Sequence, residues 1–218
     1  MTSTVDTVIF DFGGVIARNG RPRDIARRFP DLDPDVVVRA LMGDYATDGD
    51  HPWHRLERGE ITLAEHRALS RDLLAAAGID SLPIPDSPSP TPQLQFERNE
   101  PVIELIHDLR ANGVRLGLLT NNVRELRPLW WPMLPFEELF DDIVDSHEVG
   151  MRKPNPAIYQ LALARLGAEA TRTAFCDDVS SNVEAANSVG MVGVLVDEDP
   201  LPAVATVRTM AGLARHAG

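Results

Sequence analysis

The sequence predicts an α/β fold, a doubly wound parallel sheet that carries an inserted helical cap domain. Two observations predict the sheet: short apolar runs alternate with amphipathic helical patterns, and glycine or polar residues follow the apolar runs. A third observation predicts the insertion, because residues 17–97 break the alternation with charged helical patterns. Short apolar runs of this kind are typical of strands buried on both faces of a parallel sheet.

The first predicted strand covers residues 5–10 and stops at an Asp-Phe-Gly-Gly turn. An amphipathic helix is predicted over 102–109, because its apolar residues share one face, Pro101 stands near its start and Gly113 follows its end. A second helix begins at Asn155 as its cap and closes at Gly167. The remaining strands are predicted at 114–119, 143–145, 173–176 and 192–196.

Residues 17–97 predict the helical cap domain. Thr62 followed by Glu65 forms a capping-box pattern, and Asp33 or Asp35 stands near another helix start. The segment ends in a Pro-rich linker at 83–92, whose prolines exclude a helix. We therefore expect a core made of residues 1–16 and 98–218 with the cap between them. The alternative is a long surface loop within one domain.

Composition excludes several classes of function. The 218 residues are 44% hydrophobic, which is enough for a sizeable core, and the net charge of -12 predicts no nucleic-acid or membrane partner. The sole cysteine, Cys176, makes no internal disulfide and has no metal-ligand spacing around it. The sequence shows neither a signal peptide nor a long apolar run. We therefore expect a soluble cytoplasmic protein.

Polar residues follow four of the predicted strands. They are Asp11 after the first, Thr120 and Asn121 after the second, Lys153 in the loop after the third, and Asp177 and Asp178 after the fourth. Parallel strands present their carboxyl ends at one edge of the sheet, where ligands bind. Three carboxylates at one edge repel each other unless a cation or raised pKa values compensate. The donor set therefore predicts Mg²⁺ as the cofactor.

These residues lie in four motifs whose order and spacing resemble those of the haloacid dehalogenase superfamily along the whole chain. The motifs are DFGGV at 11–15, LLTNN at 118–122, RKP at 152–154 and FCDDVSSN at 175–182. The set is most similar to the branch that includes the phosphatase domain of bifunctional epoxide hydrolases and sugar-phosphate phosphatases. The resemblance implies a Rossmann-like core, and a hydrolase that acts on a small phosphorylated metabolite.

The resemblance also implies roles for the motif residues. Asp11 would be the nucleophile that forms an aspartyl-phosphate. Thr120 would hydrogen-bond a phosphoryl oxygen, with the backbone amide of Asn121 as a second donor, and Lys153 would hold both phosphate and nucleophile. The implied metal ligands are Asp11, Asp178, the backbone carbonyl of Gly13, and Asp177 either directly or through water. Asn182 is expected to orient one of these groups.

Gly13 departs from the family pattern, which carries a second aspartate two positions after the nucleophile as the proton donor. Three explanations compete. The substrate has a leaving group that needs little protonation, or a cap residue such as His51 or His54 supplies the acid, or the protein binds a phosphorylated ligand without catalysis. Trp53 and His54 are the candidate substrate contacts in the cap.

Two other questions stay open at this point. One alternative function is dehalogenase-type hydrolysis of a carbon–halogen bond without metal, which the adjacent Asp177 and Asp178 disfavour. The protein is expected to be a monomer or a homodimer. The pair Trp130-Trp131 fits either core packing or an exposed patch for another subunit.

Overall fold

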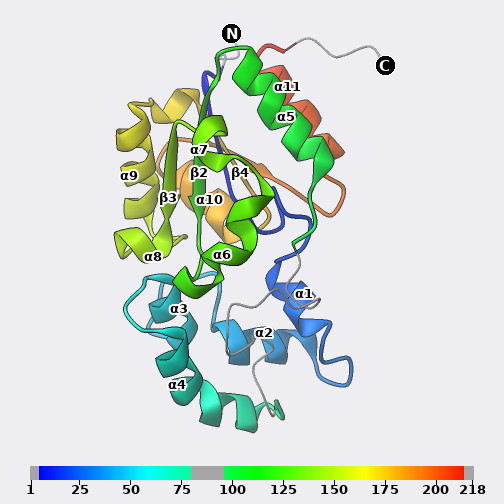
Figure 1. The fold of residues 1–218 in the computed structure, drawn as a ribbon, viewed down its shortest axis with the longest axis vertical. Helices are drawn as coiled ribbons and strands as arrows, with labels where there is room; N and C mark the ends of the chain where they lie inside the picture. Colours follow the sequence, from blue (N-terminus) through cyan, green and yellow to red (C-terminus); the bar gives the residue numbers. More distant parts are fainter. Residues whose placement is uncertain (1–4, 80–95, 214–218) are drawn as a thin grey trace.

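The computed structural model describes residues 5–79 and 96–213. Its centre is a sheet of parallel strands in the order β3-β2-β1-β4-β5, with helices on both faces (Figure 1). The predicted fold class is confirmed. The strands are β1 (Thr7–Phe10), β2 (Arg115–Thr120), β3 (Asp142–Asp145), β4 (Thr173–Asp177) and β5 (Val192–Leu195).

The helices after residue 99 cover the two faces of the sheet. In Figure 1, α5 and α11 lie side by side on one face, and α9 and α10 cover the other. The α-helices of this part are α5 (Glu100–Ala111), α6 (Arg127–Trp130), α7 (Phe136–Leu139), α8 (Ser146–Val149), α9 (Pro156–Leu166), α10 (Ser180–Ser188) and α11 (Leu201–Met210). The short 3-10 helices are η2 (Arg124–Leu126), η3 (Trp131–Met133) and η4 (Ala170–Arg172).

Alternation along β1 builds two hydrophobic clusters, one on each face. Val8 and Phe10 pack in the cluster under α5 and α11, whereas Ile9 packs in the cluster under α9. Trp130 is fully buried in the first cluster, and Trp131 packs against it with its ring stacked on Phe136. The tryptophan pair therefore belongs to core packing.

Local signals placed the helix ends correctly. The Asn155 side chain accepts a hydrogen bond from the Ala157 amide and caps α9, and Gly167 ends that helix in the left-handed conformation. Asp33, rather than Asp35, is the cap of the second helix of the insertion. The Thr62–Glu65 capping box is present at the start of α4 (Leu63–Ala76).

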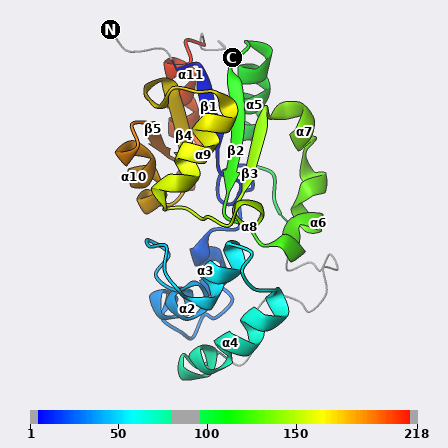
Figure 2. The ribbon, with the colours of Figure 1, turned by 90° about the vertical axis from the view of Figure 1, so that its left-hand side faces the viewer.

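The inserted segment forms a separate helical unit beyond the carboxyl ends of the strands (Figure 2). Its helices are α1 (Pro22–Ala26), α2 (Pro34–Met42), α3 (Pro52–Glu57) and α4 (Leu63–Ala76). Their buried side chains make a third hydrophobic cluster, which the core joins through Val123 and Leu126. This separate cluster supports the proposed division into a cap of 17–97 and a core of 1–16 and 98–218. The Pro-rich linker at 83–92 lies outside the described residues.

Candidate active site

The candidate site lies where the chain reverses the direction in which it adds strands. From β1 the chain winds outward through β2 to β3, and then returns to place β4 on the other side of β1. Asp11 follows β1, Asp177 ends β4, and Asp178 comes next. One carboxylate oxygen of each lies within 4.8 Å of the others. The structure therefore brings the three predicted acidic residues together at the switch point of the sheet.

Lys153 lies between two of these carboxylates. Its Nζ is 2.8 Å from Asp11 Oδ1 and 2.7 Å from Asp177 Oδ2, and the residue is only 1% exposed. The side chain of Asn121 fixes the lysine backbone, because its Oδ1 accepts a bond from Lys153 N at 2.8 Å and its Nδ2 donates to Lys153 O at 3.0 Å. The residue after β2 thus positions the cation of the site.

Asp177 is the most heavily bonded of the three carboxylates. Besides Lys153, its oxygens accept bonds from the Val179 amide at 2.8 Å and from Asn182 Nδ2 at 3.0 and 3.2 Å. Asn182 therefore orients Asp177. Asn182 lies in the first turn of α10, which begins at Ser180. Asp178 has Arg21 as its charged neighbour, with Nε 3.6 Å from Oδ2.

Burial and mutual repulsion set the electrostatics of the site. Burial, together with the charge of Asp177, raises the pKa of Asp11 above its ordinary value, although Lys153 opposes that shift. The same causes, with Asp11 as a further neighbour, raise the pKa of Asp178. For Lys153, burial favours the neutral amine. The charges of Asp11 and Asp177 outweigh the effect of burial and raise the pKa of Lys153. A charged lysine thus compensates only part of the negative charge.

The donor set fits a magnesium ion. Three clustered carboxylates supply hard oxygen ligands, and burial together with the neighbouring carboxylates raises the pKa of Asp11 and of Asp178, as expected where a cation would be favourable. Asp178 and Asp11 line the pocket, whereas both oxygens of Asp177 already accept hydrogen bonds. This arrangement favours Asp11 and Asp178 as direct ligands and Asp177 as an indirect one.

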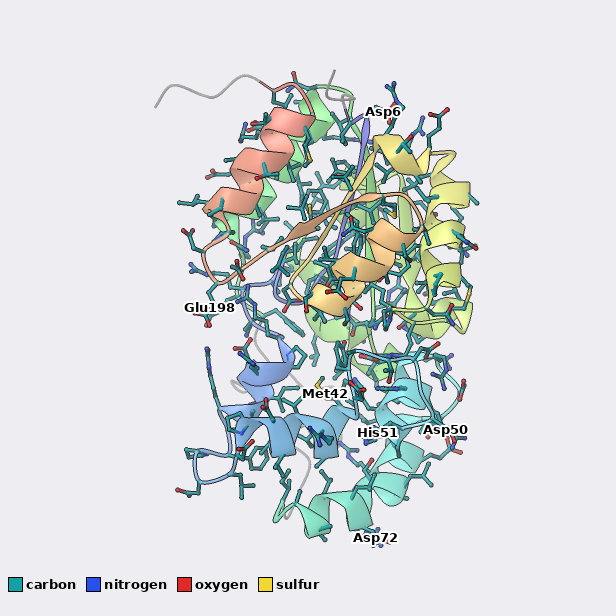
Figure 3. The ribbon with its side chains drawn as sticks, turned by 180° about the vertical axis from the view of Figure 1, so that it is seen from behind. Asp6, Met42, Asp50, His51, Asp72 and Glu198 are labelled. Carbon is teal, nitrogen blue, oxygen red and sulfur yellow. The ribbon has the colours of Figure 1, made fainter. Side chains whose placement is uncertain are left out.

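Binding of Mg²⁺ is expected to raise the midpoint of thermal unfolding, because an ion that binds only the folded state stabilises it by about 3 kcal/mol at 100 times its Kd. Asp178→Asn should shrink the increase. Asp72→Asn, on the exposed far side of the cap (Figure 3), is the control and should leave it unchanged. Equal increases in wild type and Asp178→Asn would contradict a site at Asp178.

A pocket of about 170 Å³ opens above these residues and extends into the helical unit. Core residues of its lining include Asp11, Gly13, Thr120, Asn121 and Asp178. From the cap, Trp53 lines the same pocket, so the structure places this predicted contact beside the site.

His54 does not line the pocket, which corrects its expected placement as a substrate contact. Its side chain is 1% exposed inside the cap, where Nδ1 accepts a hydrogen bond from the Gly49 amide at 3.0 Å. Burial, with the nearby charge of Arg152, lowers the pKa of His54 to about 4, so the ring is neutral at pH 7 and lacks the acidic proton of an imidazolium. His51 is also absent from the lining.

This lowered pKa predicts that the protein loses stability in acid. The unfolded His54 takes a proton below about pH 6.5 and the folded one only near pH 4, so its contribution is full above pH 6.5 and is lost as the pH falls toward 4. In His54→Asn, whose Oδ1 can accept the Gly49 bond, the midpoint of thermal unfolding should fall less between these pH values. An identical fall in both proteins would contradict the assignment.

Sequence reasoning missed a buried ion pair between the core and the cap. Arg152 Nε donates to Glu57 Oε2 at 2.8 Å, and both residues are at most 1% exposed. Glu57 Oε1 also accepts bonds from Trp53 Nε1 at 2.8 Å and Tyr45 OH at 3.1 Å.

The composition also contains a signal for Lys153. It is the single lysine in a chain with 20 arginines, which singles out its position.

The arrangement is an α/β core with a cluster of three acidic residues at the edge of its parallel sheet, under a helical cap. Comparison with protein families matches residues 5–190 to the haloacid dehalogenase-like hydrolases. The chain belongs to this family and is an enzyme of its class. The described residues hold no helix with the length and apolar character to cross a membrane.

Several known proteins are similar to this chain. It is 31% identical over 214 residues to mouse acyl-CoA dehydrogenase family member 10, over 97% of this chain and 20% of that protein. It is 28% identical to a sesquiterpene phosphatase of Aspergillus oryzae, over 89% and 91% of the two chains. It is 30% identical to mouse bifunctional epoxide hydrolase 2, over 86% and 35%. The chain thus spans a minor part of both mouse proteins and nearly all of the fungal one.

Solved structures share the fold. A HAD-like family hydrolase from Porphyromonas gingivalis superposes with a TM-score of 0.66 at 25% identity, over 94% of this chain and 98% of that one. A HAD family enzyme from Bacteroides thetaiotaomicron, solved with magnesium and inorganic phosphate, gives a TM-score of 0.60 at 18% identity, over 89% and 96%.

Proposed function

We propose that this enzyme is a Mg²⁺-dependent phosphatase that hydrolyses a small phosphomonoester through Asp11. The observation that carries the proposal is the position of Lys153 Nζ, which bridges the pocket-lining Asp11 and the buried Asp177. A buried cation beside a nucleophilic carboxylate suits the binding of a phosphoryl group. The phosphatase names of relatives, among them the sesquiterpene phosphatase, support this choice.

In the proposed reaction, an Asp11 carboxylate oxygen attacks phosphorus and the bond from phosphorus to the alcohol oxygen breaks. The alcohol oxygen leaves with the electron pair of that bond and takes a proton from water. A second water then attacks the acyl phosphate on Asp11, which releases inorganic phosphate and restores the carboxylate. Two lower barriers replace one high barrier.

Other residues of the chain orient the phosphoryl group. Lys153 stabilises the negative charge that shifts onto its oxygens, and Asn121 keeps the lysine in place through two bonds to its backbone. Thr120 ends β2 within the lining of the pocket, where its hydroxyl and the Asn121 amide are the proposed donors to a phosphoryl oxygen. Asn182 holds Asp177, and Asp177 in turn holds Lys153.

Asp11, Asp178 and the Gly13 carbonyl are the proposed ligands of Mg²⁺, with Asp177 bound directly or through water. When bound, the ion neutralises charge on the phosphoryl oxygens and on the carboxylates. The cap covers this site, and we propose that it excludes water and selects the leaving group. Its Trp53 is the proposed substrate contact.

No aspartate stands at position 13 to protonate the leaving alcohol. The neutral histidines of the cap do not face the pocket. We infer that the enzyme lacks a strong general acid, which is worth about 10²–10⁴ in rate. Among substrates that bind equally well, those whose leaving groups need little protonation, such as aryl, acyl or anomeric phosphates, should therefore react fastest.

The test is phosphate release from aryl, acyl, anomeric and primary alkyl phosphates, with Mg²⁺ or with a chelator. We expect metal-dependent release that Asp11→Asn abolishes and that falls steeply as the pKa of the leaving group rises.

Gly13→Asp should make the rate depend less steeply on the pKa of the leaving group, because it introduces a proton donor. Gly13→Ala is its control. A Cβ at Gly13 would lie 3.3 Å from the Gly20 carbonyl oxygen, so both variants meet the same modest crowding.

Two outcomes would replace this proposal. Consumption of a 2-haloacid without metal, and no phosphate release from any ester, would favour the dehalogenase reaction. Binding of phosphorylated compounds without turnover, unaffected by Asp11→Asn, would favour a binding protein.

A further inference from the structure

The pocket carries a cluster of apolar side chains where the leaving group of a bound phosphomonoester would lie. Asp11 and Thr120 line the core side, and the hydrophobic side chains come from the cap and from adjoining core segments. Figure 3 shows Met42 on the side of the cap that faces the sheet. The principal apolar lining residues are Phe12, Ile25, Met42, Trp53, Phe96 and Leu126.

The polar groups in this wall already make hydrogen bonds or ion pairs within the protein. The indole N–H of Trp53 and the hydroxyl of Tyr45 both donate to Glu57 Oε1, at 2.8 and 3.1 Å, and Arg152 donates to Glu57 Oε2 at 2.8 Å. One Asp24 oxygen accepts a bond from the Arg21 amide and the other pairs with Arg27.

The other two polar side chains on the cap side of the lining, Asn19 and Arg28, have partners as well. A hydroxyl-rich leaving group would therefore find few available partners along this wall. Each hydroxyl buried without a partner weakens binding by about tenfold or more.

We propose that this wall is a subsite for a compact apolar leaving group, so that the substrates are phosphomonoesters of apolar alcohols or phenols rather than sugar phosphates. This inference rests on the proposed phosphatase function. The pocket volume of about 170 Å³ sets an upper limit on the size of the group, because the phosphoryl group would occupy part of the same pocket. A cavity of about 150 Å³ holds benzene, so the leaving group contains at most about six carbons.

The test is a series of straight-chain alkyl phosphates from ethyl to octyl, assayed with the magnesium-loaded enzyme. Their leaving groups have nearly equal pKa values, so the missing acid at position 13 affects all of them alike. We expect kcat/KM to rise about fourfold per methylene, the factor for burying one CH₂ group, and to level off at or before about six carbons. Glucose 6-phosphate, also an ester of a primary alcohol, should react more slowly than hexyl phosphate.

Matched variants locate the subsite. Ile25→Asn and Leu126→Asn place an amide on half-buried positions of the wall, and each should reduce the hexyl-to-ethyl ratio of kcat/KM. Leu69→Asn changes an apolar side chain of α4 that is 48% exposed and outside the lining, and should leave the ratio unchanged. Thermal unfolding midpoints of the three variants control for folding.

The results separate this inference from the function on which it rests. Equal kcat/KM along the alkyl series, or faster reaction of glucose 6-phosphate, would overturn the apolar subsite while metal-dependent phosphate release upheld the phosphatase. A ratio that fell equally in Leu69→Asn would also overturn it. Absence of phosphate release from every ester, together with Asp11→Asn behaving as wild type, would overturn both.

Discussion

Lys153→Met is expected to reduce phosphate release by about 10²–10³-fold, the usual effect of removing one preorganised charge stabiliser. Methionine retains much of the lysine volume, so packing against the Phe175 ring persists while the charge is lost. Without the ammonium group, Asp11 and Asp177 keep no cationic partner in a buried site. The repulsion between the Asp11 and Asp177 carboxylates is then no longer offset by a cation. The site also binds a phosphate dianion less well, because it has lost the positive charge beside the nucleophile.

The same variant should be less stable, because removing one partner of a buried ion pair typically costs about 3–5 kcal/mol. Added Mg²⁺ should restore part of that loss, since the ion supplies positive charge among the same carboxylates. Lys153→Arg tests whether the position of the charge matters as well as its sign. It keeps the positive charge, but in a larger planar group that does not fit the space of a side chain that is only 1% exposed. Full activity in Lys153→Met would contradict the proposed role.

Among substitutions of residues that take no part in the proposed reaction, Arg152→Met should cause the largest loss of unfolding free energy. The variant leaves the Glu57 carboxylate buried with only the Trp53 and Tyr45 donors. A loss of about 3–5 kcal/mol in unfolding free energy is expected for breaking such a pair. Because Glu57 belongs to the cap and Arg152 adjoins Lys153, the variant should also raise KM.

A double-mutant cycle isolates this interaction. Glu57→Gln in the Arg152→Met background removes the unpaired charge and should recover part of the lost stability. Arg172→Met is the control, because Arg172 and Asp6 form an exposed pair whose expected contribution is about 0–1 kcal/mol. Additive effects of the Arg152 and Glu57 substitutions would contradict coupling between core and cap.

Much of the fold could be predicted because its signals are local. The Asn155 cap, the Gly167 stop and the Thr62–Glu65 capping box depend on residues within a few positions of each other. The acidic site could also be predicted, since parallel strands bring their carboxyl ends to one edge whatever the details of packing.

The remaining features depend on contacts that no pattern in the sequence marks, most of them between residues far apart in the chain. The pairing of Arg152 with Glu57 joins positions 95 residues apart, and nothing local distinguishes Glu57 from the other acidic residues of the cap. The orientation of the His54 ring depends on a hydrogen bond inside the cap, in which the Gly49 amide donates to His54 Nδ1. Likewise, the amide of Asn121 could cap a helix or reach across the sheet edge, and only the fold selects the backbone of Lys153.

The most direct test of the central claim is to quench the magnesium-loaded enzyme in acid during turnover of an aryl phosphate and to analyse its peptides by mass spectrometry. The account predicts one added phosphoryl group on the peptide that contains Asp11, lost on treatment with hydroxylamine and absent in Asp11→Asn. Phosphorylation of a different residue, or continued phosphate release by Asp11→Asn, would contradict it.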